Sequence, residues 1–419
     1  MELKKYKLGD LAQVTRGASL SGEYYATQGN YIRLTCGNFD YRNNCFKENQ
    51  SKDNIYYVGD FKEEFLLEKG DIITPLTEQA IGLLGSTARI PESGKYIQSQ
   101  DIAKIDCNES LLDKDFAFYL ISSACVKKQL SAAAQQTKIR HTSPDKIKEC
   151  TVWIPSLDVQ KRIGRILTDI DNKIAINRQI NDNLEAMAKQ LYDYWFVQFD
   201  FPNEEGKPYK SSGGAMVWNE KLKREIPQGW SNGVLSDVAN ITMGQSPDGS
   251  SYNEDGEGII FYQGSTDFGL RFPDIRQYTT SPSRYANKGD ILMSVRAPVG
   301  ALNIANNDCC IGRGLSALSS KIGSMTHLYY LMNDFRLKFE GMNSAGTTFG
   351  SITKDELFSL PVVIPTKSVI SEFEQVCEPI FDKQMIIGEE INALTKQRDE
   401  LLPLLMNGQA TVNYHLSAY

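Results

Sequence analysis

Residues 155–200 read PSLDVQKRIGRILTDIDNKIAINRQINDNLEAMAKQLYDYWFVQFD, and this stretch predicts one long helix. One series of residues recurs every seven positions and a second apolar stripe runs beside it, which is typical of a helix that packs along another long helix. The first series, the helix seam, consists of Ile163, Ile170, Asn177, Leu184 and Leu191, and the companion stripe of Ile166, Ile180, Met187 and Tyr194. At about 1.5 Å per residue, a helix of roughly 40 residues is about 60 Å long, the size of a spacer.

The composition allows two or three domains in 419 residues. No run of about 18 apolar residues occurs and the N-terminus MELKKYKLGD lacks the apolar core of a signal peptide, so we expect a cytoplasmic protein without a membrane span.

The eight cysteines form no CxxC pair, which predicts reduced, mostly buried thiols and neither a zinc site nor a disulfide framework. The formal net charge of -7 argues only mildly against nucleic acid as a partner, because a local basic face is enough to bind DNA.

The chain contains an internal repeat. Lys7–Tyr25, KLGDLAQVTRGASLSGEYY, aligns without a gap with Val234–Tyr252, VLSDVANITMGQSPDGSSY. Further on, Lys69–Ile73 corresponds to Lys288–Leu292, a turn that leads into an apolar strand in both copies. The repeat closes where Ile154 and Pro155 align with Ile364 and Pro365, and it carries the seam onto a second long helix. The seam positions of that second helix are Phe373, Ile380, Ile387, Leu394 and Leu401.

The chain is therefore predicted to be a tandem duplication of one unit, a domain of short strands and helices followed by a long helix. Both variable domains are expected to be α+β, because short β-like runs bounded by glycine and aspartate turns precede a helix-like segment. The predicted boundaries are 1–150 for the first domain, 151–200 for its helix, 201–230 for a polar connector, 231–365 for the second domain, and 366–419 for the second helix and C-terminal tail.

The sequence carries no motif of a known enzyme class. It has no phosphate loop, dinucleotide fingerprint, paired-histidine metal helix or hydrolase motif, and it lacks the asparagine-proline-proline-aromatic motif with which adenine methyltransferases hold a flipped base. His141, His327 and His415 lie far apart, and we expect His327 to be packed or solvated rather than a ligand. We therefore predict no catalytic residue and no metal site in this chain.

Polar and basic residues gather instead at equivalent places in the two copies. Arginine and glutamine can make bidentate contacts to base edges, and lysine and threonine can hold phosphates, so these groups suit DNA. For each residue taken singly, a solvated loop position is the competing interpretation. The candidates are Gln135, Gln136, Thr137, Lys138, Arg140 and His141, with Arg33, Thr77 and Gln79 at strand ends, in the first copy, and Arg296, Arg313, Thr347 and Thr348 in the second.

Several stretches of the sequence together resemble a known family, the specificity subunits of type I restriction-modification systems. The resemblance covers essentially the whole chain, and the order of these stretches in the two copies is more specific than any one of them. The stretches are Trp153-Ile154-Pro155 followed by Gln160–Ile163, the Ile226–Trp230 turn IPQGW, the Gly289–Arg296 strand GDILMSVR, the Ile311–Leu315 turn IGRGL and the closing Leu401–Gly408 LLPLLMNG.

The resemblance implies a non-catalytic, DNA-recognising subunit. Each variable domain would be a target recognition domain for one half of a split site in double-stranded DNA, and the two long helices would pair as an antiparallel coiled coil that acts as a spacer. Two modification (methyltransferase) subunits and the restriction subunits would be the protein partners. No cofactor would bind this chain, and S-adenosylmethionine would be bound by the modification subunits, which flip and methylate an adenine.

The two copies also differ. The first lacks the IPQGW turn, and it has Thr77 and Gln79 where the second has Val295 and Arg296 nearby, so we expect an asymmetric site. Asn177 would either fix the register of the helices or be an exposed residue at a frayed edge. Two other functions remain open from the sequence, a degenerate methyltransferase or nuclease and a coiled-coil scaffold that binds only proteins.

Overall fold

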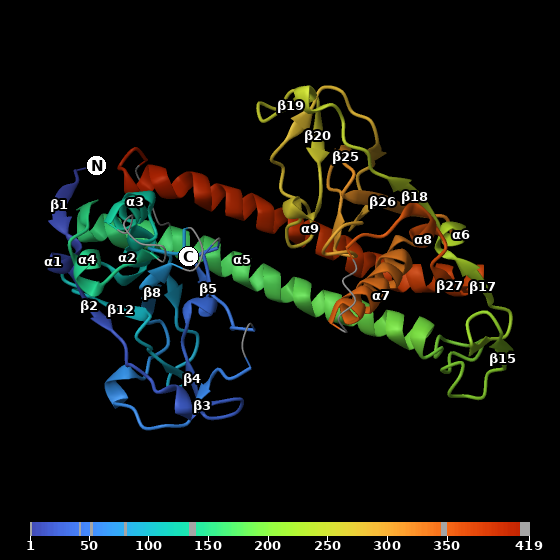
Figure 1. Cartoon of the computed structure of the whole chain (residues 1–419), viewed down its shortest axis with the longest axis horizontal. Helices are drawn as coiled ribbons and strands as arrows, with labels where there is room; N and C mark the ends of the chain where they lie inside the picture. Colours follow the sequence, from blue (N-terminus) through green and yellow to red (C-terminus); the bar gives the residue numbers. More distant parts are fainter. Residues whose placement is uncertain are drawn as a thin grey trace, which may run out of the picture. The chain divides into compact units, whose positions relative to one another are not determined.

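The computed structural model describes residues 2–41, 43–50, 53–78, 82–133, 140–344 and 350–410. The chain forms two compact units, unit 1 with Met1–Ala175 and Ala393–Tyr419, and unit 2 with Ile176–Asn392. Both units mix sheets and helices, so the fold is α+β (Figure 1). The two boundaries fall inside the two long helices, so each helix contributes residues to both units.

Unit 1 is built around a four-stranded antiparallel sheet with the order β10-β8-β12-β2. Its strands are β10 (Ala88–Arg89), β8 (Ile72–Pro75), β12 (Ile102–Cys107) and β2 (Ala12–Arg16). Helices α2 (Lys114–Ile121) and α3 (Ala124–Ala133) pack on this sheet, because Phe116 and Val126 share one buried cluster with Ile72 and Ile105. A smaller sheet contains β11 (Tyr96–Ile97), β4 (Tyr31–Arg33), β7 (Tyr56–Tyr57) and β3 (Tyr25–Ala26), and β5 (Phe39–Asp40) pairs with β6 (Cys45–Phe46).

Unit 2 repeats this plan. Its four-stranded sheet has the order β18-β26-β23-β24, with β18 (Ala239–Met243), β26 (Leu315–Ser320), β23 (Ile291–Ser294) and β24 (Leu302–Ile304). Helix α7 (Met325–Ser344) covers it in the way that α2 and α3 cover the first sheet. The second sheet contains β19 (Tyr252–Asn253), β21 (Tyr278–Thr279), β20 (Ile259–Tyr262), β25 (Cys309–Ile311) and β22 (Tyr285–Ala286).

The start of each copy folds as the sequence alignment predicts. The short helices α1 (Leu8–Leu11) and α6 (Leu235–Val238) each contain an aspartate that caps the chain before them. Asp10 accepts a hydrogen bond from the Lys7 N–H at 3.1 Å, and Asp237 accepts one from the Val234 N–H at 2.8 Å. The internal duplication is thus visible in individual hydrogen bonds.

Each variable domain is closed by its own first and last strands. The strand β1 (Lys4–Lys7) pairs antiparallel with β14 (Thr151–Ile154), and β17 (Ser231–Val234) pairs in the same way with β27 (Pro361–Ile364). The long helix starts directly after each closing strand, so the domain and its helix are joined by a short, hydrogen-bonded base. Two short helices precede these strands, α4 (Pro144–Lys148) and α8 (Lys354–Phe358).

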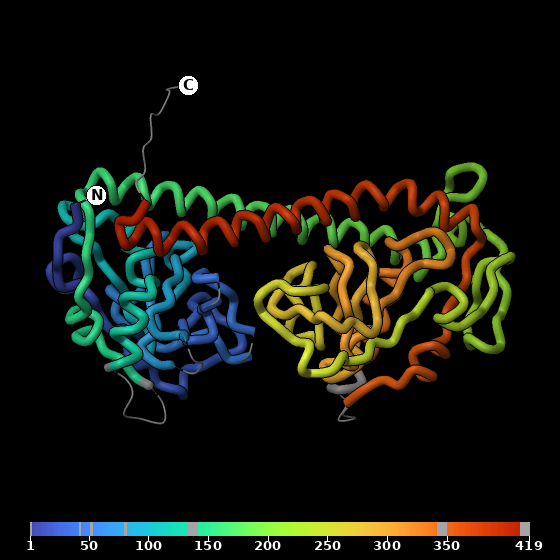
Figure 2. The backbone as a smooth tube through the Cα atoms, turned by 90° about the horizontal axis from the view of Figure 1, so that it is seen from above, coloured from blue at the N-terminus to red at the C-terminus, as the bar shows by residue number. Residues whose placement is uncertain are grey.

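The long helices α5 (Leu157–Tyr192) and α9 (Lys367–Met406) pack antiparallel against each other in each unit (Figure 2). Arg398 of α9 bonds to Asp171 of α5 in unit 1, and Glu390 of α9 accepts a hydrogen bond from the Asn177 side chain at 2.9 Å in unit 2. Asn177 is buried in the middle of α5, so it is not an exposed residue at a frayed edge of the helix. All ten predicted seam residues are buried or half-buried, namely Ile163, Ile170, Asn177, Leu184, Leu191, Phe373, Ile380, Ile387, Leu394 and Leu401.

The predicted companion stripe is wrong at three of its four positions, whereas Ile166 is half-buried. Ile180, Met187 and Tyr194 are exposed, at 38%, 52% and 36%. The buried companion lies on the other side of the seam, four residues after each seam position, as in Leu167 and Ile174. Heptad spacing leaves either side of the seam open, and packing of the helix against the rest of its unit selects the buried one. The other members of the buried stripe are Gln160, Asn181, Ala188 and Trp195.

The connector between the two copies is ordered. It contains a hairpin of β15 (Met216–Asn219) and β16 (Arg224–Pro227), which leads to Trp230 of the IPQGW turn. The Trp230 ring stacks on Phe201, with ring centroids 5.1 Å apart, and lies near Phe196, which follows α5. The polar connector therefore ends by docking an aromatic side chain into the core of unit 2.

Gly244, at the end of β18, is held too close to its neighbours to carry a side chain. A Cβ there would lie 2.2 Å from the carbonyl oxygen of Gly312, and its counterpart Gly17 meets the oxygen of Gln98 at the same distance. We predict that Gly244→Ala lowers the free energy of unfolding by about 1–3 kcal/mol, because the backbone must move apart. Gly249→Ala is the control, since a Cβ added there would have no neighbour within 4 Å. Urea unfolding of both variants measures this, and an equal effect of the two would contradict it.

His327 of α7 is 2% exposed, and its ring lies against Phe196 at a centroid distance of 4.5 Å. Burial lowers the pKa of His327 from 6.5 to about 3. Below pH 6.5, His327 therefore binds a proton in the unfolded chain and stays neutral in the folded chain. The free energy of unfolding falls as the pH falls. Between pH 6.5 and 5 we expect a loss of about 2 kcal/mol from this residue. Unfolding free energies of the wild type and His327→Phe at these two pH values test it; an equal pH dependence would show that another group is responsible.

Candidate nucleic-acid interface

In unit 1 the fold joins two of the predicted groups. The strand β9 (Thr77–Glu78) continues the course of β8, and β13 (Arg140–His141) pairs with it antiparallel, so that His141 lies opposite Thr77 and Arg140 opposite Glu78. The Thr77 hydroxyl is 3.3 Å from Nδ1 of His141 and 3.4 Å from a carboxylate oxygen of Asp101. The predicted residues Gln79, Gln135, Gln136, Thr137 and Lys138 lie outside the described residues.

Unit 2 has the same junction. Arg296, two residues after the end of β23, forms an antiparallel bridge with Ser351. The N–H of Ile352 donates to the Val295 carbonyl at 3.0 Å, as the N–H of Thr142 donates to the Leu76 carbonyl at 2.8 Å in unit 1. These paired bonds make Arg296 the counterpart of Thr77 and Ser351 the counterpart of His141. The predicted residues Thr347 and Thr348 lie outside the described residues.

A second turn lies beside this junction in unit 2. Arg313 is exposed between Gly312 and Gly314, two residues after the end of β25. The carbonyl of Gly314 accepts a hydrogen bond from the Val295 N–H at 2.9 Å, so the turns that carry Arg296 and Arg313 are neighbours. The sequence places these two arginines on separate segments, and the fold brings them to one surface.

Unit 1 contains the matching turn with other side chains. The Leu76 N–H donates to the Asp101 carbonyl at 2.8 Å, the counterpart of the bond to Gly314, and the exposed Gln100 therefore takes the place of Arg313. The sequence comparison missed Gln100, because the loops before it differ in length between the copies. Further exposed or half-exposed polar residues that it missed border the Arg313 turn in unit 2, namely Gln245, Ser246, Gln263 and Arg284.

The gap-free alignment of Lys7–Tyr25 with Val234–Tyr252 does mark two of the missed residues, Gln245 and Ser246. It pairs Gly17 with Gly244, and the residues after these glycines run beside the turn in both copies. The N–H of Ala18 donates to the Gln98 carbonyl at 2.9 Å, and the N–H of Gln245 to the Ile311 carbonyl at 3.0 Å. Only Gln245 and Ser246 after Gly244 are marked in this way, and their place beside the Arg313 turn follows from the hydrogen bonds.

Arg33 does not belong to this surface. It is 6% exposed, its Nη2 donates to the carbonyl of Asn54 at 3.1 Å, and its guanidinium stacks over the Tyr25 ring at 3.8 Å. By strand pairing its counterpart in unit 2 is Phe261, a core residue. These contacts contradict our expectation that Arg33 contacts DNA, and assign it to the packing of the small sheet.

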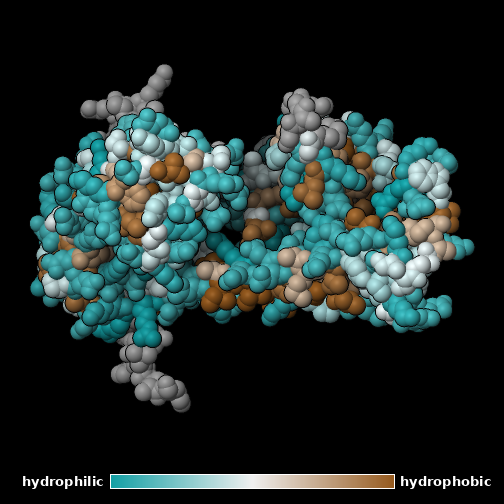
Figure 3. All heavy atoms as spheres, turned by 90° about the horizontal axis from the view of Figure 1, so that it is seen from below, coloured by the Kyte–Doolittle hydropathy of each residue, from teal (hydrophilic) through white to brown (hydrophobic). Residues whose placement is uncertain are grey.

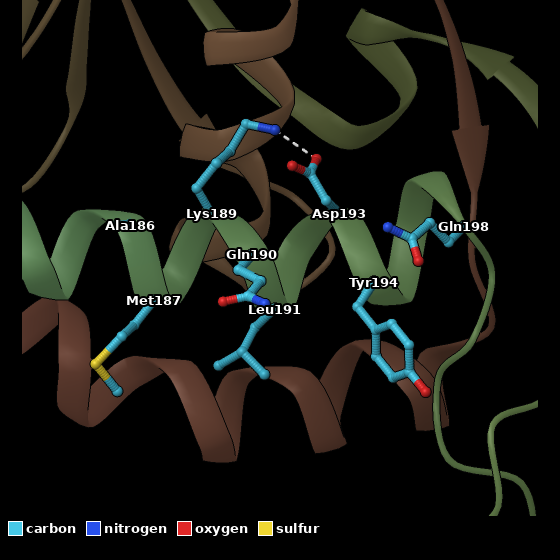
Figure 4. Close-up of a pocket in the computed structure, with 8 residues that line it drawn as sticks. All are labelled: Ala186, Met187, Lys189, Gln190, Leu191, Asp193, Tyr194 and Gln198. Carbon is cyan, nitrogen blue, oxygen red and sulfur yellow. Dashed lines mark hydrogen bonds and ion pairs between the residues drawn. The ribbon is translucent and has the colours of Figure 1, made fainter.

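The helix α5 has an exposed apolar face in unit 2. Ile176, with 57% of its surface exposed, lies on one stripe with Ile180, Met187 and Tyr194. A pocket of about 720 Å³ follows this face, and Figure 4 shows Met187, Leu191 and Tyr194 pointing to the same side of the helix. Apolar surface is visible along the long helices in the space-filling view (Figure 3).

All eight cysteines are free thiols, and five of them are buried. Burial raises the pKa of Cys309 and Cys377 to about 12, so both stay protonated near neutral pH. Over the part of the chain that the structure describes, no helix is long and apolar enough to cross a membrane.

Comparison with known proteins identifies the family. The model of the type I restriction modification DNA specificity domain matches residues 1–186 and 227–400. The putative type I restriction enzyme MjaX specificity subunit of Methanocaldococcus jannaschii is 32% identical over 375 residues, which cover 85% of this chain and 83% of that protein. The type I restriction enzyme HindI specificity subunit of Haemophilus influenzae is 22% identical, with 97% and 99% covered.

The fold also has a solved relative. The crystal structure of the type I restriction-modification system S subunit from M. genitalium superposes with a TM-score of 0.61 over 97% of this chain and 96% of that one, at 16% sequence identity. The duplicated α+β fold with two long helices is therefore shared with that structure. The family model and the relatives together show that this chain belongs to the type I restriction-modification specificity family, as a non-catalytic subunit that recognises DNA sequence.

Proposed function

We propose that each recognition domain reads one half of a split, asymmetric DNA site and that the helices α5 and α9 set the unread gap. The supporting observation is the pair of matching junctions, which have the same backbone hydrogen bonds and different side chains. Thr77 corresponds to Arg296, and Gln100 to Arg313. Equal frameworks with unequal polar groups favour two different half-sites.

The chemistry of these groups suits base recognition in the major groove. An arginine pairs with the O6 and N7 atoms of guanine, and a glutamine with the N6 and N7 atoms of adenine. Arg296 and Arg313 make unit 2 suited to guanine, whereas Gln100 gives unit 1 an adenine-binding group. The residues proposed to contact DNA are Thr77, Gln79, Gln100, Gln135, Gln136, Thr137, Lys138, Arg140 and His141 in the first copy, and Gln263, Arg296, Arg313, Thr347 and Thr348 in the second.

The partners follow from the same proposal. Two modification subunits would dock on this chain, and the exposed stripe of α5 supports a protein contact there, because apolar residues of this size are costly to leave in water. These subunits would bind S-adenosylmethionine, flip an adenine out of the duplex and methylate it, while this chain binds no cofactor. The restriction subunits would join the same complex, in the cytoplasm where the chromosome lies.

Arg313 in the second copy and Arg140 in the first allow a paired test of the two half-sites. We predict that Arg313→Ala relaxes recognition of one half-site and Arg140→Ala that of the other, each by about 1–3 kcal/mol, or roughly 5- to 150-fold, if the side chain makes a bidentate base contact. Methylation of oligonucleotides with single base changes, by the complex with its modification subunit, measures both effects. Each variant is the control for the other, and loss of selectivity at the same half-site in both variants would contradict the assignment.

The spacer role predicts a change of gap without a change of half-sites. We insert one heptad into α5 after Arg178 and one into α9 after Glu390, which preserves the seam in both helices. Seven residues add about 10 Å of helix, or about 3 base pairs. Methylome sequencing is expected to return both original half-sites with a gap about 3 base pairs longer. A change in either half-site sequence, or an unchanged gap, would count against the spacer.

A further inference from the structure

Two carboxylates of α5 each bind α9 and a recognition domain at the same time. In unit 1, Asp171 accepts a hydrogen bond from Arg398 of α9 at 2.9 Å and one from the hydroxyl of Tyr119, in α2, at 2.6 Å. In unit 2, Glu185 accepts one from Gln384 of α9 at 2.9 Å and one from Arg271, in the second recognition domain, at 2.8 Å. Each carboxylate is thus a three-way junction between the two helices and a domain.

The partners of these carboxylates are buried. Arg398 is 7% exposed, Arg271 is 9% exposed and Gln384 is fully buried. Burial raises the pKa of the Tyr119 hydroxyl well above its usual value, and the Asp171 charge adds to this effect, so the hydroxyl stays a donor. The carboxylates themselves keep part of their surface in water, with 28% of the Asp171 side chain and 34% of the Glu185 side chain exposed. Separating a carboxylate from its α9 partner leaves the buried Arg398 or Gln384 without that hydrogen bond, which is destabilising. The junctions therefore penalise any arrangement that separates their members.

The two junctions share one helix register. Asp171 and Glu185 are fourteen residues apart on α5, and Gln384 and Arg398 are fourteen apart on α9, two heptads in each case. An antiparallel pair with an apolar seam can otherwise slide by a heptad and still bury apolar residues, because the pattern repeats. Together with the aromatic packing of Phe373 on Trp195 and Phe196, the polar pairs distinguish the native register from its shifted alternatives.

Heptad-shifted registers lose both junctions. Sliding α9 by seven residues in either direction brings Ile391 or Leu405 opposite Asp171. The same shifts bring Cys377 or Ile391 opposite Glu185. Each shift places a half-buried carboxylate beside a side chain that cannot donate a strong hydrogen bond to it.

Arg398 loses Asp171 in these shifts and keeps only Asp399, its neighbour on α9, at 2.8 Å. Arg398 would lie opposite Gly164 in one direction and opposite Arg178 in the other. A glycine has no side-chain acceptor and an arginine repels a second arginine, so neither shift provides a substitute for Asp171.

Asn177 distinguishes the native register from the shifted ones much less than Asp171 and Glu185 do. Its partner Glu390 would be replaced by Lys383 or Gln397 after the same shifts, and both side chains are polar. The asparagine on the seam is therefore not the residue that fixes register, although it was the obvious candidate from the heptad pattern. The selective groups lie beside the seam, where a carboxylate faces a specific cation or amide.

We propose that Asp171 and Glu185, through Arg398 and Gln384, are positioning residues that fix the length of the unread DNA gap. Because Tyr119 and Arg271 bind the same carboxylates, the position of each recognition domain is tied to the register of the helices. A single register then means a single gap. This inference rests on the proposed function, in which two domains read two half-sites.

The test removes the α9 partners and keeps the domain contacts. In Arg398→Met with Gln384→Leu, both carboxylates keep Tyr119 and Arg271 but face apolar residues in the native register as well as in the shifted ones. The variant is expressed with its modification subunit, and its methylome is sequenced. We expect the original half-sites at the original gap and, in addition, at a gap about 3 base pairs longer or shorter. General loss of stability would lower methylation at every site without creating a new gap.

The matched control is Lys396→Met with Gln375→Leu, the same types of substitution at exposed positions of α9; it is expected to keep the single gap. If the double variant does not accumulate, the single variants Arg398→Met and Gln384→Leu replace it, with a smaller share of the new gap expected. A single unchanged gap in the double variant, or in both single variants when they replace it, overturns the inference. A wild-type methylome without two half-sites would contradict the proposed function itself, so the two failures are distinguishable.

Discussion

The antiparallel packing of α5 on α9 is the constraint on which the rest of the structure depends. Apolar seam residues such as Ile163 and Phe373 bury the helices against each other and supply most of the driving force. They do not select one register, because the same apolar pattern returns every heptad. Selection comes from the contacts of Asp171 and Glu185 with buried polar side chains of α9, which exist in one register only. Stability and geometry are thus supplied by different residues of one interface.

The recognition domains use the opposite strategy, in which the framework is kept and the side chains change. Both copies close on a pair of first and last strands, and both place a strand end beside a turn held by the same hydrogen bonds. Exposed residues on such turns carry no part of the core, so Gln100 and Arg313 can differ without cost to folding. Arg33 shows the converse, because a buried guanidinium stacked on Tyr25 is part of the packing.

Much of the architecture follows from the sequence, because heptad spacing and an internal repeat are local patterns. The seam, the duplication and the α+β class of each domain depend on residues close together in the chain or on a fixed offset. The side of α5 that carries the companion stripe does not, since Met187 and Ala188 are equally compatible with the spacing. Only the packing of unit 2 decides that Ala188 is buried and Met187 exposed.

The candidate site is less accessible to sequence reasoning for a related reason. Thr77 and His141 are 64 positions apart, and their pairing depends on how the domain closes rather than on any local propensity. The correspondence of Gln100 with Arg313 is not visible in the sequence, because unequal loop lengths shift the offset between the copies. The hydrogen bonds to equivalent carbonyls reveal it. Arg33 was misassigned because an arginine at a strand end looks the same in sequence whether it faces solvent or an aromatic ring.

The central claim is the proposal that the two recognition domains of one chain read different half-sites and that the long helices set a single gap between them. Methylome sequencing of cells that carry the unaltered chain with its modification subunit tests it most directly. The account predicts one bipartite methylation motif, with two unlike half-sites and a single unread gap between them. A continuous motif, a palindromic one, or the same half-sites at several gaps would contradict it.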